Sequence, residues 1–122
     1  KEELRMSMQV EVEHFRQALI VRLKGELDHH TAAAVKNKME EAILRSNCSY
    51  LVLNLEDLQF MDSSGIGVIL GRYKLIKSRG GKVMVCGVTP SVYRLLEMSG
   101  LFKILEVEDT ETQALASLGV VS

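Results

Sequence analysis

Residues 50–55 read Tyr-Leu-Val-Leu-Asn-Leu, a nearly continuous apolar run without alternation. A strand with one wet face alternates apolar and polar residues, whereas a strand covered on both faces of a largely parallel sheet does not. We therefore expect a central, doubly covered strand here. Residues 83–86, Val-Met-Val-Cys, predict the next buried strand.

Two amphipathic helices are predicted next to these strands. The first runs from Thr31 to about Arg45, with either Asp28 or Thr31 as its cap. The second follows a loop at residues 56–62 and ends at Arg79, where two glycines stop it. The apolar positions that fall at helical spacing and predict the buried faces are Ala32, Val35, Met39, Ala42 and Ile43 in the first helix, and Ile66, Ile69, Leu70, Tyr73 and Ile76 in the second.

The remaining segments complete an α/β pattern. Residues 8–13 alternate and pair with 18–24 as a hairpin, and a short helix begins near Pro90. A last strand is predicted at 104–107 and a terminal helix at 111–118. We expect a single mixed, mostly parallel sheet of about five strands that starts with a hairpin and packs with about four helices. Residues 8–122 form this one domain, and 1–7 are expected to be a disordered extension.

Composition narrows the classes of function. The chain has 122 residues, 47% of them hydrophobic and 25% charged, with a formal net charge of -1. A nearly neutral chain has no overall field that would draw it to nucleic acid or to an anionic membrane. Two cysteines and no signal-peptide pattern indicate reduced thiols, and hence the cytoplasm.

The stretch with the most chemical information is 60–67, Phe-Met-Asp-Ser-Ser-Gly-Ile-Gly, where a loop becomes a helix. Asp62, Ser63 or Ser64 can each cap the first turn through a side-chain oxygen. The free amides and positive dipole end of a helix start also favour negative charge, so a phosphate added to a serine there is tolerated. Spacing alone leaves both interpretations open.

Four blocks of the sequence are informative together: 25–31 (Gly-Glu-Leu-Asp-His-His-Thr), 52–58 (Val-Leu-Asn-Leu-Glu-Asp-Leu), 61–74 (Met-Asp-Ser-Ser-Gly-Ile-Gly-Val-Ile-Leu-Gly-Arg-Tyr-Lys) and 98–104 (Met-Ser-Gly-Leu-Phe-Lys-Ile). With these blocks the chain resembles the STAS-domain family. The similarity runs from about Met6 to the C-terminus, and it implies the STAS fold.

The resemblance also implies a function, that of an anti-anti-sigma factor regulating transcription in sporulation. In such proteins the unphosphorylated form binds an anti-sigma factor that is also a serine kinase, and the sporulation sigma factor is released. Phosphorylation of one serine abolishes this binding, and the resemblance implies that this serine is Ser63 here. A PP2C-type serine phosphatase removes the phosphate again. The resemblance places Asp28 on the surface that docks against the kinase.

The second helix carries a further stripe of Val68, Gly71, Arg72 and Leu75, which is either a wider buried face or a docking surface. With this surface included, the predicted partner-binding residues are Asp28, Asp62, Ser64, Gly65, Ile66, Gly67, Val68 and Arg72. The second interpretation places a phosphate on Ser63 beside the interface, where its charge would repel a partner or be costly to desolvate.

Rival functions have weaker support in the residues. His29 and His30 diverge as neighbours, so we predict no metal site. The glycines at 65, 67 and 71 lack the spacing of a dinucleotide-binding fingerprint, and we expect them to allow close helix packing. Ser63 lacks the preceding glycine of a nucleophile elbow, which argues against a hydrolase. We predict no cofactor and no enzyme activity. The alternatives are a STAS antagonist in a stress-response sigma pathway and a small-molecule-binding or enzymatic α/β domain.

Overall fold

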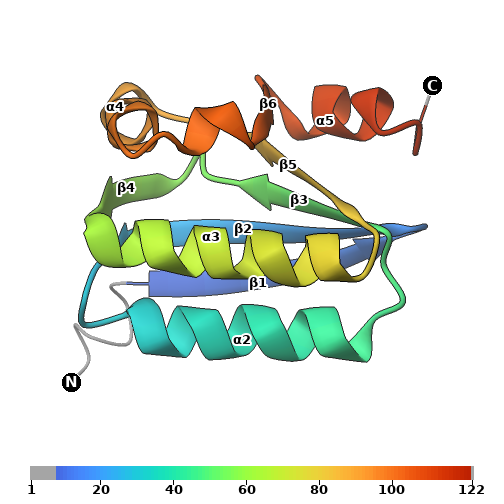
Figure 1. The fold of residues 1–122 in the computed structure, drawn as a ribbon, viewed down its shortest axis with the longest axis horizontal. Coiled ribbons are helices and arrows are strands. Elements are labelled where there is room, and N and C mark those ends of the chain that lie inside the picture. Colours follow the sequence, from blue (N-terminus) through green and yellow to red (C-terminus); the bar gives the residue numbers. More distant parts are fainter. Residues whose placement is uncertain (1–7, 122) are drawn as a thin grey trace.

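A computed structural model describes residues 8–121, so the predicted extension 1–7 lies outside the described residues. The elements, in chain order, are β1 (Met8–Phe15), β2 (Ala18–Leu27), α2 (Ala32–Arg45), β3 (Tyr50–Asn54), β4 (Leu58–Met61), α3 (Ser63–Ser78), β5 (Lys82–Cys86), α4 (Pro90–Met98), a 3-10 turn (Leu101–Lys103), β6 (Glu106–Glu108) and α5 (Glu111–Ser117) (Figure 1). Within 8–121, none of the helices combines the length and hydropathy needed to span a bilayer.

The six strands form one mixed sheet in the order β1-β2-β3-β5-β6, with β4 also paired to β2. Only the opening hairpin of β1 and β2 is antiparallel among these pairs. The predicted hairpin and the mostly parallel sheet are therefore confirmed. The hairpin connection is shorter than predicted, because Phe15 already pairs with Ala18 and only Arg16 and Gln17 remain outside the ladder.

The long strand β2 has two different parallel neighbours along one edge. Its residues 18–22 pair with β3, and its residues 25–27 pair with β4, with an irregularity in that pairing between Gly25 and Glu26. The predicted loop at 56–62 is thus wrong in its middle part. Residues 58–61 follow a buried-exposed-exposed-buried pattern with no period of two, so their strand conformation is set by pairing with β2 and leaves no local pattern in the sequence.

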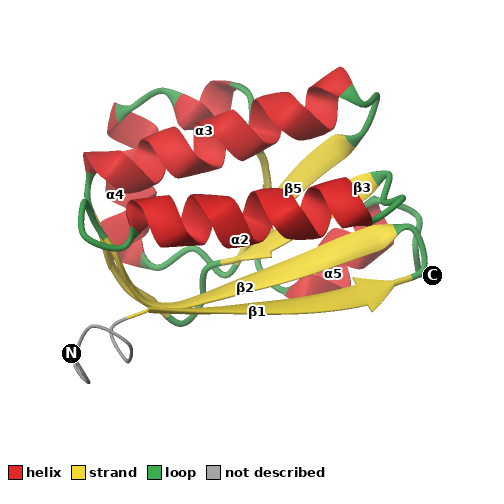
Figure 2. Cartoon of the chain, turned by 90° about the horizontal axis from the view of Figure 1, so that it is seen from below, coloured by secondary structure: helices red, strands yellow, loops and turns green. Residues whose placement is uncertain are grey.

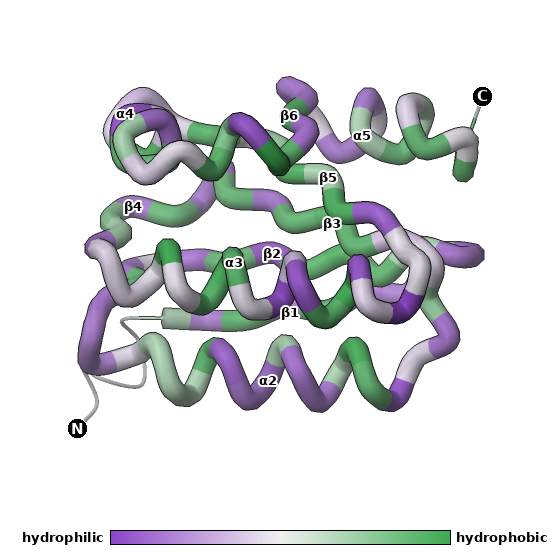
Figure 3. The backbone as a smooth tube through the Cα atoms, in the orientation of Figure 1, coloured by the Kyte–Doolittle hydropathy of each residue, from purple (hydrophilic) through white to green (hydrophobic). Residues whose placement is uncertain are grey.

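Helices α2, α3 and α4 pack into one large apolar cluster with β2, β3 and β5. Side chains that meet in this cluster include Leu27, Met39, Leu53, Ile69 and Leu96, all fully buried. The hydropathy colouring shows polar and apolar stretches alternating along α2, whereas β3 and β5 are largely apolar (Figure 3). The predicted doubly covered strands are confirmed, since β3 and β5 are buried over nearly their whole length.

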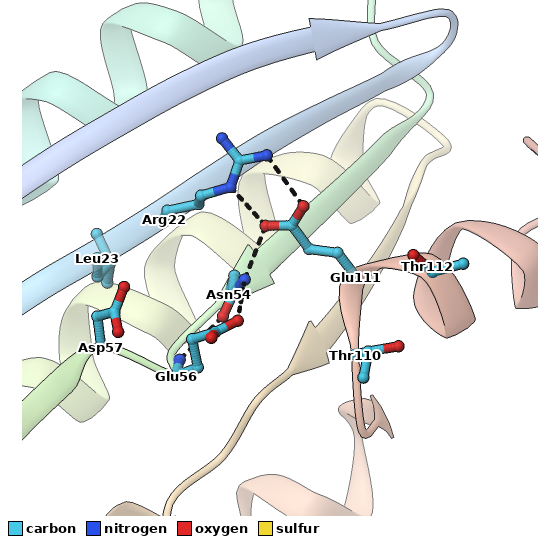
Figure 4. A pocket seen from close by; sticks show the side chains of 8 residues that line it. All are labelled: Arg22, Leu23, Asn54, Glu56, Asp57, Thr110, Glu111 and Thr112. Carbon is cyan, nitrogen blue, oxygen red and sulfur yellow. Dashed lines mark hydrogen bonds and ion pairs between the residues drawn. The ribbon is translucent and has the colours of Figure 1, made fainter.

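A smaller apolar cluster lies on the opposite face of the sheet, where Ile20, Val52 and Met84 pack with Ala114 of α5. A polar network also holds this short helix. Glu111 accepts two hydrogen bonds from Arg22, at 2.5 Å from Nε and 2.9 Å from Nη2, and one from Asn54 Nδ2 at 2.7 Å (Figure 4). These bonds from Arg22 hold the pKa of Glu111 below its usual range although partial burial opposes the shift.

Candidate functional site

The candidate site forms where β2 and β4 end side by side. Leu27 pairs with Met61, so the next residues, Asp28 and Asp62, emerge at the same edge of the sheet. The amide of Asp62 donates to the carbonyl of Leu27 at 3.1 Å. Parallel pairing thus brings together two segments that are more than thirty positions apart in the sequence.

Asp62 joins these two segments through its carboxylate. Oδ1 accepts a hydrogen bond from the Ser64 amide at 2.8 Å, so Asp62 is the cap of α3 among the three alternatives left open by the sequence. Oδ2 accepts from the backbone amide of His29 at 3.2 Å. One side chain therefore both starts the helix that carries Ser63 and holds the loop that follows β2.

Asp28 organises the loop before α2. Its Oδ1 accepts from the amides of His30 and Thr31, at 2.9 and 3.1 Å. Thr31 occupies the N-cap position, but its hydroxyl accepts from the amide of Asp28 and donates to the carbonyl of Glu26 at 2.8 Å. The two predicted cap candidates therefore fold the loop jointly, and neither side chain caps a first-turn amide of α2.

Both carboxylates are ionised at neutral pH. Partial desolvation favours the neutral form of Asp62, but hydrogen bonds from the amides of Ser64 and His29 outweigh it and lower its pKa. Desolvation is likewise outweighed at Asp28 by the amides of His30 and Thr31, so the pKa of Asp28 is also lowered. The site thus presents two fixed negative charges beside the helix start.

The rings of two histidines lie close to these carboxylates, one beside each. His29 Nδ1 is 3.6 Å from Asp62 Oδ2, and His30 Nδ1 is 3.9 Å from Asp28 Oδ1. Their ring centroids are 3.9 Å apart, so the expectation that these two neighbouring side chains diverge is wrong. The sequence interpretation weighed this pair only as a metal site and missed its place at the junction. The sequence did contain one signal for this loop. An aspartate such as Asp28 often accepts hydrogen bonds from the backbone amides of the residues that follow it and so folds a turn.

Ser63 is the first residue of α3, and its side chain is exposed. Ser64 is half-buried and supplies the amide that Asp62 caps. Of the two serines, Ser63 is the more accessible to another macromolecule. Ile66 is partly exposed and Gly67 is exposed on the following turn.

Three residues predicted on the partner-binding surface are instead buried. Val68 is 5% exposed and Arg72 is 7% exposed, because α3 packs on the sheet and on α2 at once. Gly65 is covered by Met61 and Leu27, and a methyl group there would overlap the side chain of Met61. The second stripe of α3 is therefore mainly a wider buried face, with Gly71 and Leu75 only partly exposed at its border.

Gly67 and Gly71 do not serve the close helix packing predicted from their spacing. A Cβ built on either residue meets no atom within 4 Å outside the immediate helix backbone. Within residues 8–121, there is thus room for a side chain at both positions. Glycine in a helix interior nevertheless costs about 1 kcal/mol relative to alanine.

A comparison with protein-family models matches the description "STAS domain" to residues 9–114. The chain belongs to the STAS-domain family. A STAS-domain relative from Paenibacillus polymyxa, named anti-sigma F factor antagonist, is 61% identical over 117 residues, which cover 96% of this chain and 100% of the relative.

Solved STAS structures agree with the fold. The unphosphorylated form of the anti-sigma factor antagonist SpoIIAA has a TM-score of 0.77 and 31% identity, covering 94% of this chain and 99% of the other. The phosphorylated form of SpoIIAA, described as a Bacillus cell fate determinant, has a TM-score of 0.71 and 31% identity over 90% of this chain and 99% of its own. The predicted family and the predicted STAS fold are confirmed.

Proposed function

We propose that this chain is an anti-anti-sigma factor of sporulation. Its unphosphorylated form binds an anti-sigma factor that is also a serine kinase, which frees the sigma factor, and phosphorylation of Ser63 abolishes this binding. A PP2C-type serine phosphatase restores the active form. The chain acts in the cytoplasm as a binding partner and a kinase substrate. It has no catalytic activity, needs no cofactor and binds neither nucleic acid nor a membrane.

The observation that carries the proposal is the junction built by Asp62. Its carboxylate places exposed Ser63 at the start of a long helix and fixes the loop of Asp28 next to it. A phosphate on Ser63 adds about -1.5 to -2 charges, and the helix start can accommodate that charge without unfolding. Modification therefore changes the surface while the fold persists.

The added charge would fall beside two carboxylates that are already ionised. A partner that docks on this junction in the unmodified state must then approach a cluster of three anionic groups. Full reversal from a 99:1 bound state to 1:99 needs about 5.5 kcal/mol of differential affinity. A dianion against a partner carboxylate or a desolvated apolar contact can supply a large part of that difference.

Exposed Gly67 supports α3 as a docking surface. Since nothing in the described chain lies near the position of its missing side chain, its cost in helix stability is not explained by internal packing. A glycine allows another backbone to approach the helix closely. The partner surface that we propose comprises Asp28, Asp62, Ser63, Ser64, Ile66 and Gly67.

The test uses the anti-sigma F factor of Paenibacillus polymyxa, since the relative named as its antagonist is 61% identical to this chain. After incubation with this factor and ATP, intact mass should show one added phosphate, and peptide mapping should place it on Ser63. Ser63→Ala should bind the factor but stay unmodified, whereas the control Ser64→Ala should be modified like the wild type. Phosphate on Ser64 would refute the residue assignment.

A second arm measures affinity. Ser63→Asp should weaken binding by about tenfold or more, equivalent to about 1.4 kcal/mol or more. Its melting temperature should stay close to that of the wild type, because an acidic side chain suits the first turn of a helix. A large loss of stability would indicate that Ser63 is chiefly structural. An anti-sigma-B factor in the same assay distinguishes the sporulation pathway from a stress-response pathway.

A further inference from the structure

Arg72 is a charged side chain buried in the middle of α3. Its residue is 7% exposed, and its Nε and Nη1 atoms have no hydrogen-bond partner among residues 8–121. Nη2 lies 3.9 Å from Oε2 of Glu40 on α2, an ion pair that is too long to be a hydrogen bond. The guanidinium is therefore desolvated with little direct compensation.

Stability does not account for an arginine at this place. A buried ion pair without supporting hydrogen bonds seldom repays the cost of desolvation, and an apolar residue of similar size is often as stable or more so. The buried residues before and after it on α3, Ile69 and Ile76, belong to the apolar cluster, so an apolar side chain at position 72 would suit the same helix face. Arg72 thus calls for another explanation.

We propose that Arg72 is a positioning residue that fixes α2 against α3 and so holds the Asp28 loop next to Ser63. This inference rests on the proposed function. Apart from the ion pair of Arg72 and from hydrogen bonds at their C-terminal ends, the two helices meet through apolar side chains without strong directional preference, with Val35, Met39 and Ile43 in the same cluster as Val68 and Ile76. Sliding or pivoting α2 would carry Glu40 away and leave the buried charge uncompensated, which penalises other placements more than the native one.

The placement of the polar contacts supports this role. Helices α2 and α3 lie side by side in both views (Figures 1 and 2). At their C-terminal ends, Arg79, the residue directly after α3, donates to the carbonyls of Ile43 in α2 and of Ser46 directly after α2. Arg72 and Glu40 meet between this anchor and the junction of Asp62 with His29. Arg72 therefore limits a pivot about the far anchor that would separate the two halves of the site.

The test compares Arg72→Met with Arg72→Lys and with Arg45→Met, an exposed arginine of α2 paired only with Glu41 at 3.3 Å in the described chain. Three properties are measured: the melting temperature, hydrogen exchange of the His29 amide by NMR, and affinity for the anti-sigma F factor of Paenibacillus polymyxa. The second property needs no partner, so it tests the inference even if the proposed function fails.

Arg72→Met should melt at or above the wild-type temperature, yet exchange its His29 amide about tenfold faster and bind the factor about tenfold more weakly. Arg72→Lys keeps the charge and should recover part of both losses, while Arg45→Met should behave like the wild type. Wild-type exchange and affinity in Arg72→Met would overturn the inference. If the wild type itself does not bind the factor, the proposed function is at fault, and the exchange rates still decide the role of Arg72.

Discussion

At the scale of single residues, Asp62 has the most consequences because its two carboxylate oxygens serve different segments. Oδ1 caps α3 through Ser64, and Oδ2 binds the amide of His29 in the loop after β2. The same carboxylate faces the His29 ring. Loss of this side chain would therefore affect both the start of the helix and the position of the loop.

Asp62→Ala should lower the free energy of unfolding by about 1 kcal/mol, the usual cost of a lost N-cap. Asp62→Asn keeps an acceptor oxygen for Ser64 and should lose less. Urea denaturation followed by circular dichroism measures both values. Asp57→Ala removes an exposed acid from the preceding loop and is the matched control. If Asp62→Ala unfolds at the same urea concentration as the control, the capping role is refuted.

At the scale of elements, α3 has two sides with opposite demands on its glycines. On the buried side, Met61 and Leu27 lie so close to Gly65 that no side chain fits there. On the exposed side, Gly67 faces open space. Two glycines two residues apart therefore predict opposite outcomes when each receives one methyl group.

Gly65→Ala should lower the free energy of unfolding by about 1–3 kcal/mol, because its Cβ would overlap Met61 and force the helix away from the strand ends. Gly67→Ala should raise it by up to about 1 kcal/mol through helix propensity alone. Equilibrium denaturation of the pair gives both signs. Stabilised Gly67→Ala should also bind the anti-sigma factor more weakly, and undiminished binding would exclude close approach at this glycine.

The same helix shows what the sequence could and could not predict. Periodicity located α3 and its end near Arg79, and it predicted the burial of Ile69 and Ile76. Periodicity could not predict whether Arg72 is buried. A polar residue inside the buried face of a helix and one at its border have the same spacing in the sequence, and only the position of α2 distinguishes them. The link from Asp62 to His29 was equally hidden, since it depends on β4, a strand that pairing with β2 creates.

At the scale of the whole molecule, the sheet separates two apolar clusters. The large cluster under α2, α3 and α4 supports the candidate site, and the smaller one under α5 lies on the opposite face. Arg22, Asn54 and Glu111 join β2, β3 and α5 in one polar network. Three carboxylates have a pKa below the usual value: Asp28 and Asp62 at the edge where β2 and β4 end, and Glu111 at the start of α5.

These shifts determine the response of the fold to acid. A carboxyl group whose folded pKa is lowered contributes stability that is fully present above its unfolded pKa of about 4, and this contribution is lost as pH falls through the folded value. The free energy of unfolding should thus be nearly constant from neutral pH down to about 5 and fall steeply below about 4. Urea denaturation across this range measures the curve.

Glu111→Gln should flatten the acid limb of that curve, because one of the shifted carboxyl groups no longer titrates. Its stability at neutral pH should be lower, since Arg22 loses the carboxylate that it binds with two nitrogens. Glu106→Gln, an exposed acid on β6, serves as the control. An acid limb as steep as that of the wild type would exclude Glu111 as a contributor.

Strand β2 pairs first with β3 and then with β4, and its side chains contribute to both faces of the sheet. The number of residues along β2 therefore sets which side chain reaches which face. Arg22 at its middle belongs to the network of α5, and Leu27 at its end underlies Gly65. Because successive side chains of a strand point to opposite faces, deleting one residue between them would turn Leu27 toward the wrong face. An insertion or deletion of a single residue between Arg22 and Leu27 should therefore disturb one of the two faces, so the length of this segment is fixed by the alternation of its side chains.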